Sequence, residues 1–186
     1  PTVMFAPPFV GMDAGWTAIT AHLPRRFCGV YAEQLNADVD RWMFQGRQRF
    51  NNPLAVGKRQ GLRAIVSALR DGLPLYLLPD MDHGERDAVF VPFFGVTAAT
   101  VTSLPRLARL GKARVVPVLT RLVPDGYEVT VHSPWEGYPG GTVEEDTAAM
   151  NRALEGYIRT MPEQYYWVHK RFKTRPSGAP PFYIGV

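Results

Sequence analysis

The acidic side chains that could take part in chemistry lie in two loops, each after a strand-like run. Asp13 stands in "APPFVGMDAGW", just before a helix-like segment. Its position alone predicts a helix N-cap. Asp80 and Asp82 stand in "PDMDHG". A loop of that composition is often only a turn, but loops after buried parallel strands also gather catalytic and binding side chains.

The basic side chains are concentrated in two short segments. In "GRQRF", Arg47 and Arg49 flank one glutamine. Arginines on a loop are usually solvated, but two spaced by one residue could clamp a phosphate or a carboxylate. The run "HKRFKTRP", from His169 to Pro176, holds four cations and an aromatic ring. Such a run is typical of solvated surface, although it could also contact lipid phosphates or RNA.

The histidines give no metal or acid-base signal of their own. His83 and Asp87 are four residues apart, and so are His132 and Glu136, but neither pair lies on a convincing helix. The sequence contains no phosphate-binding glycine loop with a following lysine, no GxSxG elbow, no dinucleotide fingerprint and no zinc-ligand spacing. We therefore expect no metal, and the residues by themselves indicate an anionic ligand.

Strand-like and helix-like segments alternate along the chain. The strand-like runs are Thr2–Ala6, Phe27–Ala32, Leu75–Leu78, Ala88–Phe94, Arg114–Leu122 and Tyr127–Val131. Helices are predicted at about Asp13–Leu23, Ala37–Phe44, 62–69, Ala98–Leu110 and from Thr142 to Pro162. This alternation predicts an α/β fold with a mostly parallel sheet flanked by helices. Thr2–Ala6, Phe27–Ala32, Leu75–Leu78 and Arg114–Leu122 should share that sheet, with ligands at the carboxyl ends of the strands.

Composition narrows the classes of partner. The 186 residues are 46% hydrophobic and 20% charged, as in ordinary globular proteins, with a formal charge of +4 and a pI of about 9.4. A positive surface suits an acidic protein, a phospholipid surface or nucleic acid. Cys28 is the only cysteine, so an intrachain disulfide is excluded. No apolar run reaches the length of a membrane span, and the abrupt start inside a strand-like segment suggests a fragment.

Five segments in a fixed order resemble the lipid A biosynthesis acyltransferases, the late lauroyl and myristoyl transferases. The most specific are "PDMDHG", "VFVPFFGVTAAT" and "PEQYYWVHKRFKTRP", supported by "GRQRF" and "RVVPVLTR". The resemblance runs from Phe9 to Tyr183, nearly the whole chain. It implies a glycerolipid-acyltransferase-like fold, with residues 1–186 forming an acyltransferase core that lacks an N-terminal membrane anchor region.

The resemblance also implies an activity. Such an enzyme moves a fatty acyl chain from acyl carrier protein to a hydroxyl of a lipid A precursor, with no cofactor beyond that donor. It works at the cytoplasmic face of the bacterial inner membrane. The implied partners are acyl carrier protein, the lipid A precursor and an anionic membrane surface, and not nucleic acid.

The family motif is a histidine, four residues and then an acidic residue. Asp13 matches the acidic end, but the histidine position holds Pro8. Proline cannot accept the hydroxyl proton, and losing a general base costs about 10² to 10⁴ in rate. The protein is then an inactive relative, uses another base or carries a substitution. The alternative function is a catalytically inactive module that binds lipid or carrier protein.

The family motifs also suggest roles for the other candidates. Arg47 and Arg49 match basic positions beside the active site that meet substrate phosphates. Asp80 and Asp82 match a "PDxDxG" loop, where they would position basic residues or the acceptor, or only order the loop by hydrogen bonds. We expect Asp13, Arg47 and the Asp80–Asp82 loop to converge on one cleft.

Overall fold

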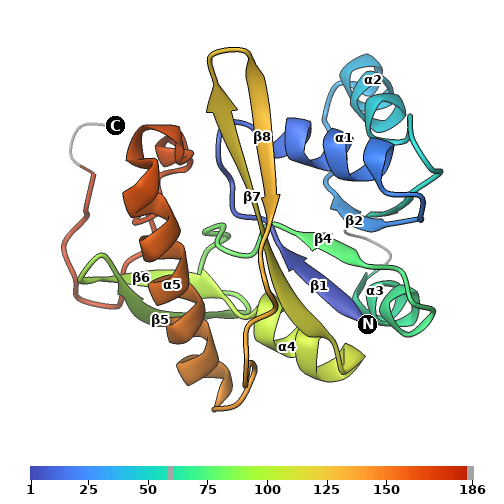
Figure 1. Ribbon diagram of the computed structural model, residues 1–186. Coiled ribbons are helices and arrows are strands. Elements are labelled where there is room, and N and C mark those ends of the chain that lie inside the picture. The colour runs from blue at the N-terminus through green and yellow to red at the C-terminus, as the bar shows by residue number, and fades with distance from the viewer. Residues whose placement is uncertain (58–60, 184–186) are drawn as a thin grey trace.

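A computed structural model describes residues 1–57 and 61–183 (Figure 1). Its centre is a six-stranded sheet in the order β3-β2-β4-β1-β7-β8. The strands are β1 (Thr2–Phe5), β2 (Cys28–Tyr31), β3 (Leu54–Gly57), β4 (Leu75–Leu77), β7 (Arg114–Val123) and β8 (Gly126–Val131). The first five are mutually parallel, and β8 returns antiparallel beside β7. The α/β class and the sharing of one sheet by the four predicted strands are confirmed, whereas β3 was not predicted.

Helices cover both faces of this sheet. On one side, α1 (Met12–His22) packs Trp16 and Ile19 against Met4 and Tyr76, with α2 (Ala37–Arg47) beside it (Figure 1). The other side holds the larger core, built with α3 (Gly61–Arg70), α4 (Ser103–Gly111) and α5 (Val143–Thr160). Buried apolar side chains on both faces are what a parallel sheet requires.

Local sequence signals place the ends of several helices. The side chain of Thr142 accepts from the Glu145 N–H at 3.2 Å, and the Glu145 carboxylate accepts from the Thr142 N–H at 2.7 Å. These two bonds form a capping box at Thr142, the residue at which the last helix was predicted to begin. After α3, Gly72 takes a φ of +84°, which the missing Cβ permits, and Leu73 N–H bonds back to the Ala68 carbonyl. The predicted starts and stops are confirmed here.

The prediction of a helix over Ala98–Leu110 is wrong in its first part. Ala98 lies in β6 (Val96–Val101), which pairs antiparallel with β5 (Ala88–Phe93) as a separate two-stranded sheet. Phe94 and Gly95 both have positive φ, which is the conformation of a tight hairpin turn. The β-branched residues that follow the turn favour a strand, so the helix α4 begins only at Ser103.

The C-terminal segment after α5 contains two short 3₁₀ turns, at Pro162–Gln164 and Trp167–His169. It returns to the sheet, where Tyr165 forms an isolated bridge with Phe9. This segment therefore contacts the loop that follows β1. Of the helices from α1 to α5, none has the length and apolar character needed to cross a membrane.

Candidate functional site

The loop after β1 carries Pro8, and backbone hydrogen bonds connect this loop to the C-terminal segment. The Tyr166 N–H donates to the Pro8 carbonyl at 2.9 Å, and the Val10 N–H donates to the Gln164 carbonyl at 2.8 Å. The Gln164 side chain in turn pairs with both backbone groups of Leu122 on β7. Pro8 itself is buried. Backbone bonds to a distant part of the chain thus fix the loop in which the family motif begins.

The N-terminus of α1 approaches β7 very closely because two glycines lie on that side. A Cβ on Gly15 would stand 2.1 Å from Thr120 Oγ1, and one on Gly11 would stand 2.6 Å from Thr120 Cγ2. Larger residues would therefore push the helix away. Gly11 is also the N-cap, without a side-chain cap, so the prediction that Asp13 is the N-cap is wrong. Asp13 lies in the first helical turn, where the helix dipole favours a negative charge.

Asp13 is paired with Arg47 at the end of α2. Oδ1 of Asp13 accepts from Nη2 of Arg47 at 3.0 Å and from Nε at 3.2 Å. The guanidinium carbon also lies 5.7 Å from the centre of the Tyr31 ring, and Trp16 Nε1 donates to the Arg47 carbonyl at 2.9 Å. The side chains are 61% exposed for Asp13 and 32% for Arg47, so the ion pair contributes at most about 1 kcal/mol to folding. Both groups remain accessible to a ligand.

A pocket of about 430 Å³ opens between α1 and α2 at this ion pair. Arg49 belongs to its lining, with its Nε–H donating to the Gly46 carbonyl at 3.1 Å. The lining residues are Asp13, Trp16, Thr17, Trp42, Met43, Gln45, Gly46, Arg47 and Arg49. The pocket combines one carboxylate and two guanidinium groups with the apolar surfaces of two tryptophans and a methionine. Such a lining can bind an anionic group and a hydrocarbon side by side.

Asp80 and Asp82 do not line this pocket, which corrects the expectation that their loop would converge on it with Asp13 and Arg47. Both side chains are completely buried. Asp80 Oδ2 accepts from the Tyr165 hydroxyl at 2.5 Å, and Asp82 accepts from the Gly84 N–H and from both the N–H and the hydroxyl of Thr174. Of the two interpretations that the sequence left open, this geometry favours loop ordering.

Arg171 is the main residue of this region that the sequence analysis misjudged, since the "HKRFKTRP" run was expected to be solvated surface. Arg171 is only 1% exposed. Its guanidinium donates to the Ala99 carbonyl at 2.7 Å and to Thr100 Oγ1 at 2.6 Å, and lies over the Phe93 ring. Burial raises the pKa of the nearby Asp80 carboxyl, while the Tyr165 hydroxyl and the charge of Arg171 act in the opposite direction. No local sequence pattern separates a buried arginine from its solvated neighbours.

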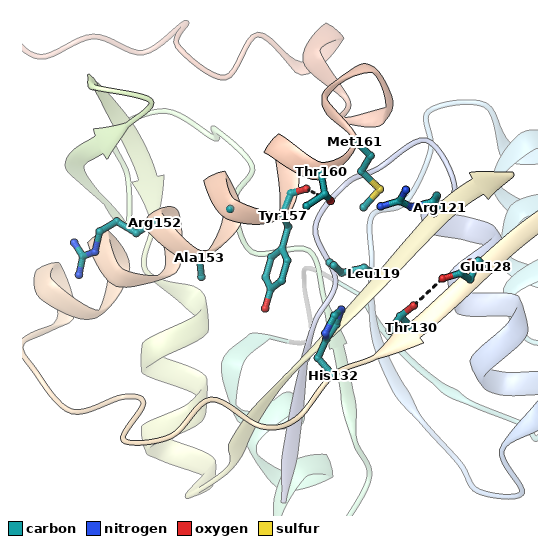
Figure 2. A pocket seen from close by; sticks show the side chains of 11 residues that line it. Leu119, Arg121, Glu128, Thr130, His132, Arg152, Ala153, Tyr157, Thr160 and Met161 are labelled. Carbon is teal, nitrogen blue, oxygen red and sulfur yellow. Dashed lines mark hydrogen bonds between the residues drawn. The ribbon is translucent and has the colours of Figure 1, made fainter.

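The fold brings no histidine into the described lining of the Asp13 pocket. His132 lies in another cavity, of about 580 Å³, between α5 and the β7–β8 hairpin (Figure 2). Its ring faces Tyr157 with the ring centres 5.6 Å apart. His169 Nε2 accepts from the Asp82 N–H at 2.7 Å, and the His83 ring lies beside it. His22 is exposed at the end of α1.

His169 should make the fold sensitive to acid. Burial, with the positive charge of Lys173, lowers the pKa of His169 to about 4. Protonation of Nε2 would also break the bond that it accepts from the Asp82 N–H. The unfolded chain binds this proton near pH 6.5, so stability is lost as pH falls from about 6.5 to 4. We expect a loss of roughly 1 to 2 kcal/mol between pH 7 and pH 4.5 in urea unfolding. His169→Gln should shrink that loss, and His22→Gln should leave it unchanged; equal losses in all three proteins would contradict the assignment.

The comparisons with known proteins agree on one family. A model of the bacterial lipid A biosynthesis acyltransferase family matches residues 1–174. The lipid A biosynthesis lauroyltransferase of Escherichia coli K12 is 40% identical over 158 residues, which are 83% of this chain and 51% of that protein. The palmitoleoyltransferase of the same organism is 39% identical over 153 residues, 80% of this chain and 49% of that protein. The lipid A biosynthesis myristoyltransferase of that organism is 29% identical over 173 residues, which are 88% of this chain and 53% of that protein.

The chain spans about half the length of the curated relatives that it matches. The part that matches contains the β1–α1 loop, the α1–α2 pocket and the buried Asp80 cluster, because the family model extends from residue 1 to residue 174. On this coverage and on the identity to the lauroyltransferase, the chain belongs to the bacterial lipid A biosynthesis acyltransferase family.

Proposed function

We propose that the protein takes part in acyl transfer from acyl carrier protein to a hydroxyl of a lipid A precursor, with the α1–α2 pocket as the acceptor site. The observation that carries this proposal is the placement of Asp13, the acidic residue of the family motif, in one pocket with Arg47 and Arg49. The two arginines were candidates from the sequence, and their position around the carboxylate supports a shared site.

The pocket has the chemistry that such an acceptor requires. A phosphorylated lipid presents anionic oxygens, which guanidinium groups bind through two parallel N–H donors. Nε and Nη2 of Arg47 already donate together to one oxygen of Asp13, and the Asp13 side chain is mostly exposed. The apolar surfaces of Trp16, Trp42 and Met43 on the same walls would contact hydrocarbon.

The proposed reaction exchanges one ester for another. The acceptor hydroxyl oxygen attacks the thioester carbonyl, a new C–O bond forms, the C–S bond breaks and the carrier thiol leaves. The hydroxyl proton must pass to a base and then to the departing sulfur. Asp13 would orient and stabilise such a base, but Pro8 has no group that can accept the proton. No cofactor is needed beyond the acyl donor.

Pro8 favours a second candidate function, a catalytically inactive module that binds lipid or carrier protein. In that case the pocket keeps its anion-binding arginines while transfer is absent. In both cases we propose a peripheral location at the cytoplasmic face of the inner membrane. A nucleic-acid role loses part of its support, because Arg171 of the basic C-terminal run is buried in the protein.

Replacing Arg47 and Arg49 together with alanine should weaken binding of a phosphorylated lipid A precursor. Well-desolvated charge-assisted contacts contribute roughly 1.5 to 3 kcal/mol each, so we expect the affinity to fall at least tenfold. Isothermal titration measures the change, with circular dichroism to check the fold. Arg63→Ala, which removes an exposed arginine from α3 on the opposite face of the sheet, is the matched control. Unchanged affinity of the double variant would mean that the pocket does not bind the acceptor phosphates.

A further inference from the structure

Helix α2 and the bend before it expose three large apolar side chains. Leu35 is 108% exposed, Val39 46% and Trp42 74%. Val39 and Trp42 are three residues apart within α2 and therefore share one side of the helix, while Leu35 lies in the bend just before the N-cap Asn36. We call these three residues the α2 stripe. Exposed apolar side chains gathered at one end of a helix mark a candidate contact site.

The opposite side of α2 is the side that binds the rest of the protein. Asp40 accepts from the Tyr31 hydroxyl, the Phe44 ring packs edge-on against the Tyr31 ring, and Arg47 pairs with Asp13. None of the residues of α2 is buried. The helix is therefore attached by polar bonds and one aromatic contact along its inner side, while the α2 stripe faces away from the core.

We propose that the α2 stripe inserts into the interface of a lipid bilayer, with α2 lying in the plane of the membrane. Leucine and valine side chains gain by leaving water, and an indole is the side chain best suited to the boundary between headgroups and acyl chains. Trp42 belongs both to the stripe and to the lining of the Asp13 pocket. Insertion at the stripe would place the mouth of that pocket at the membrane surface, where a lipid acceptor resides; this last step rests on the proposed function.

The charges near the stripe favour a membrane over an acidic protein partner. From Glu33 to Arg49 the chain carries three acidic and three basic residues, a net charge of zero. Arg41 is paired with Asp38, and Arg47 with Asp13. A surface that recognised an acidic carrier protein would need an excess of positive charge. Binding through the α2 stripe should therefore depend on apolar burial and change little with salt.

The test is flotation of the protein with vesicles of phosphatidylethanolamine and phosphatidylglycerol that contain no lipid A precursor. We expect the wild-type protein to float and its partition coefficient to change less than about twofold between 0.1 and 0.5 M NaCl. The double variant Leu35→Ser/Trp42→Ser should partition at least tenfold more weakly. The matched control is Leu110→Ser/Val168→Ser, which removes two exposed apolar side chains elsewhere and should float like the wild type.

A second measurement tests whether the indole of Trp42 enters the bilayer. Vesicles with brominated acyl chains should quench part of the tryptophan fluorescence of the wild type, and Trp42→Phe should remove most of that quenching while the protein still floats. Failure of the wild type to float, equal flotation of the double variant, or release at 0.5 M NaCl would each overturn the proposal. So would dimerisation of the wild type that the double variant abolishes in sedimentation equilibrium, because the stripe would then bind a second copy.

The two proposals can fail separately. Flotation uses vesicles without acceptor and reports on the α2 stripe alone, whereas titration of the Arg47 and Arg49 variants reports on the pocket. Unchanged affinity of the double arginine variant, together with flotation of the wild type, would refute the proposed acceptor site and keep the membrane surface. A loss of affinity in that variant, without flotation of the wild type, would do the reverse.

Discussion

Replacing Pro8 with histidine is expected to raise the rate of acyl transfer by about 10² or more. The substitution restores a base at the family's spacing from Asp13. Of the described residues, only Arg47 bonds to that carboxylate, and it uses Oδ1 alone. Oδ2 is thus available to accept from an imidazole N–H and to stabilise the imidazolium that forms.

The loop should tolerate this change. The bonds that hold it are backbone bonds from Tyr166 to the Pro8 carbonyl and from Val10 to the Gln164 carbonyl, and histidine retains both. Transfer of labelled acyl chains from acyl carrier protein to a lipid A precursor measures the gain. Pro8→Ala is the matched control, because it frees the backbone without adding a base and should show no gain. Pro8→His/Asp13→Asn should lose most of the gain.

The outcomes separate the candidate functions. Robust transfer by the unaltered protein would refute the missing-base argument and point to another residue, with His83 the first to replace. Absence of transfer from both the wild type and Pro8→His, while folding and lipid binding stay intact, would favour the binding module.

Replacing Arg171 with alanine is expected to lower the free energy of unfolding by about 3 to 5 kcal/mol. Its guanidinium makes charge-assisted bonds to Ala99 and Thr100 inside the core and lies over Phe93. Alanine would leave those acceptors unsatisfied, open a cavity and remove the positive charge that favours the ionised form of buried Asp80. Urea unfolding at pH 7 measures the change.

Two further variants test the reason for that loss. Arg152→Ala removes an exposed arginine from α5 and should change stability by less than about 0.5 kcal/mol. Arg171→Lys keeps the charge but cannot reproduce both guanidinium contacts, so it should remain clearly destabilised. A cost below about 1 kcal/mol for Arg171→Ala would show that the buried cluster contributes little to folding.

The buried cluster also matters for the candidate site. Asp80 binds the Tyr165 hydroxyl, and the residues on either side of Tyr165 bind the Pro8 loop through their backbone groups. The "PDMDHG" segment thus supports the motif loop from a distance through the C-terminal segment. Its bonds in the described part of the chain favour the loop-ordering interpretation.

Signals within a few residues of one another determined the fold class and most of the elements. The alternation of strand and helix periods is a local signal, and the α/β fold that it predicted is confirmed. The capping box of Thr142 and Glu145 and the turn between β7 and β8 also depend on neighbouring residues only. The family also followed from the order of short motifs along the chain. For Ala98 to Val101 the sequence predicted a helix, but pairing with β5 makes this segment a strand.

The arrangement of the site was decided only by tertiary structure. Asp13 and Arg47 are 34 residues apart, Asp80 and Tyr165 are 85 apart, and Arg171 reaches Thr100 across 71. Local periodicity carries no information about contacts at such separations, because the core that buries an aspartate or an arginine is assembled from the whole sheet and its helices. The sequence could therefore name Asp80, Asp82 and the basic C-terminal run as candidates, but only the folded structure shows that Asp80, Asp82 and Arg171 are buried. Asp13, Arg47 and Arg49 lie outside that core, at the surface, where a ligand can reach them.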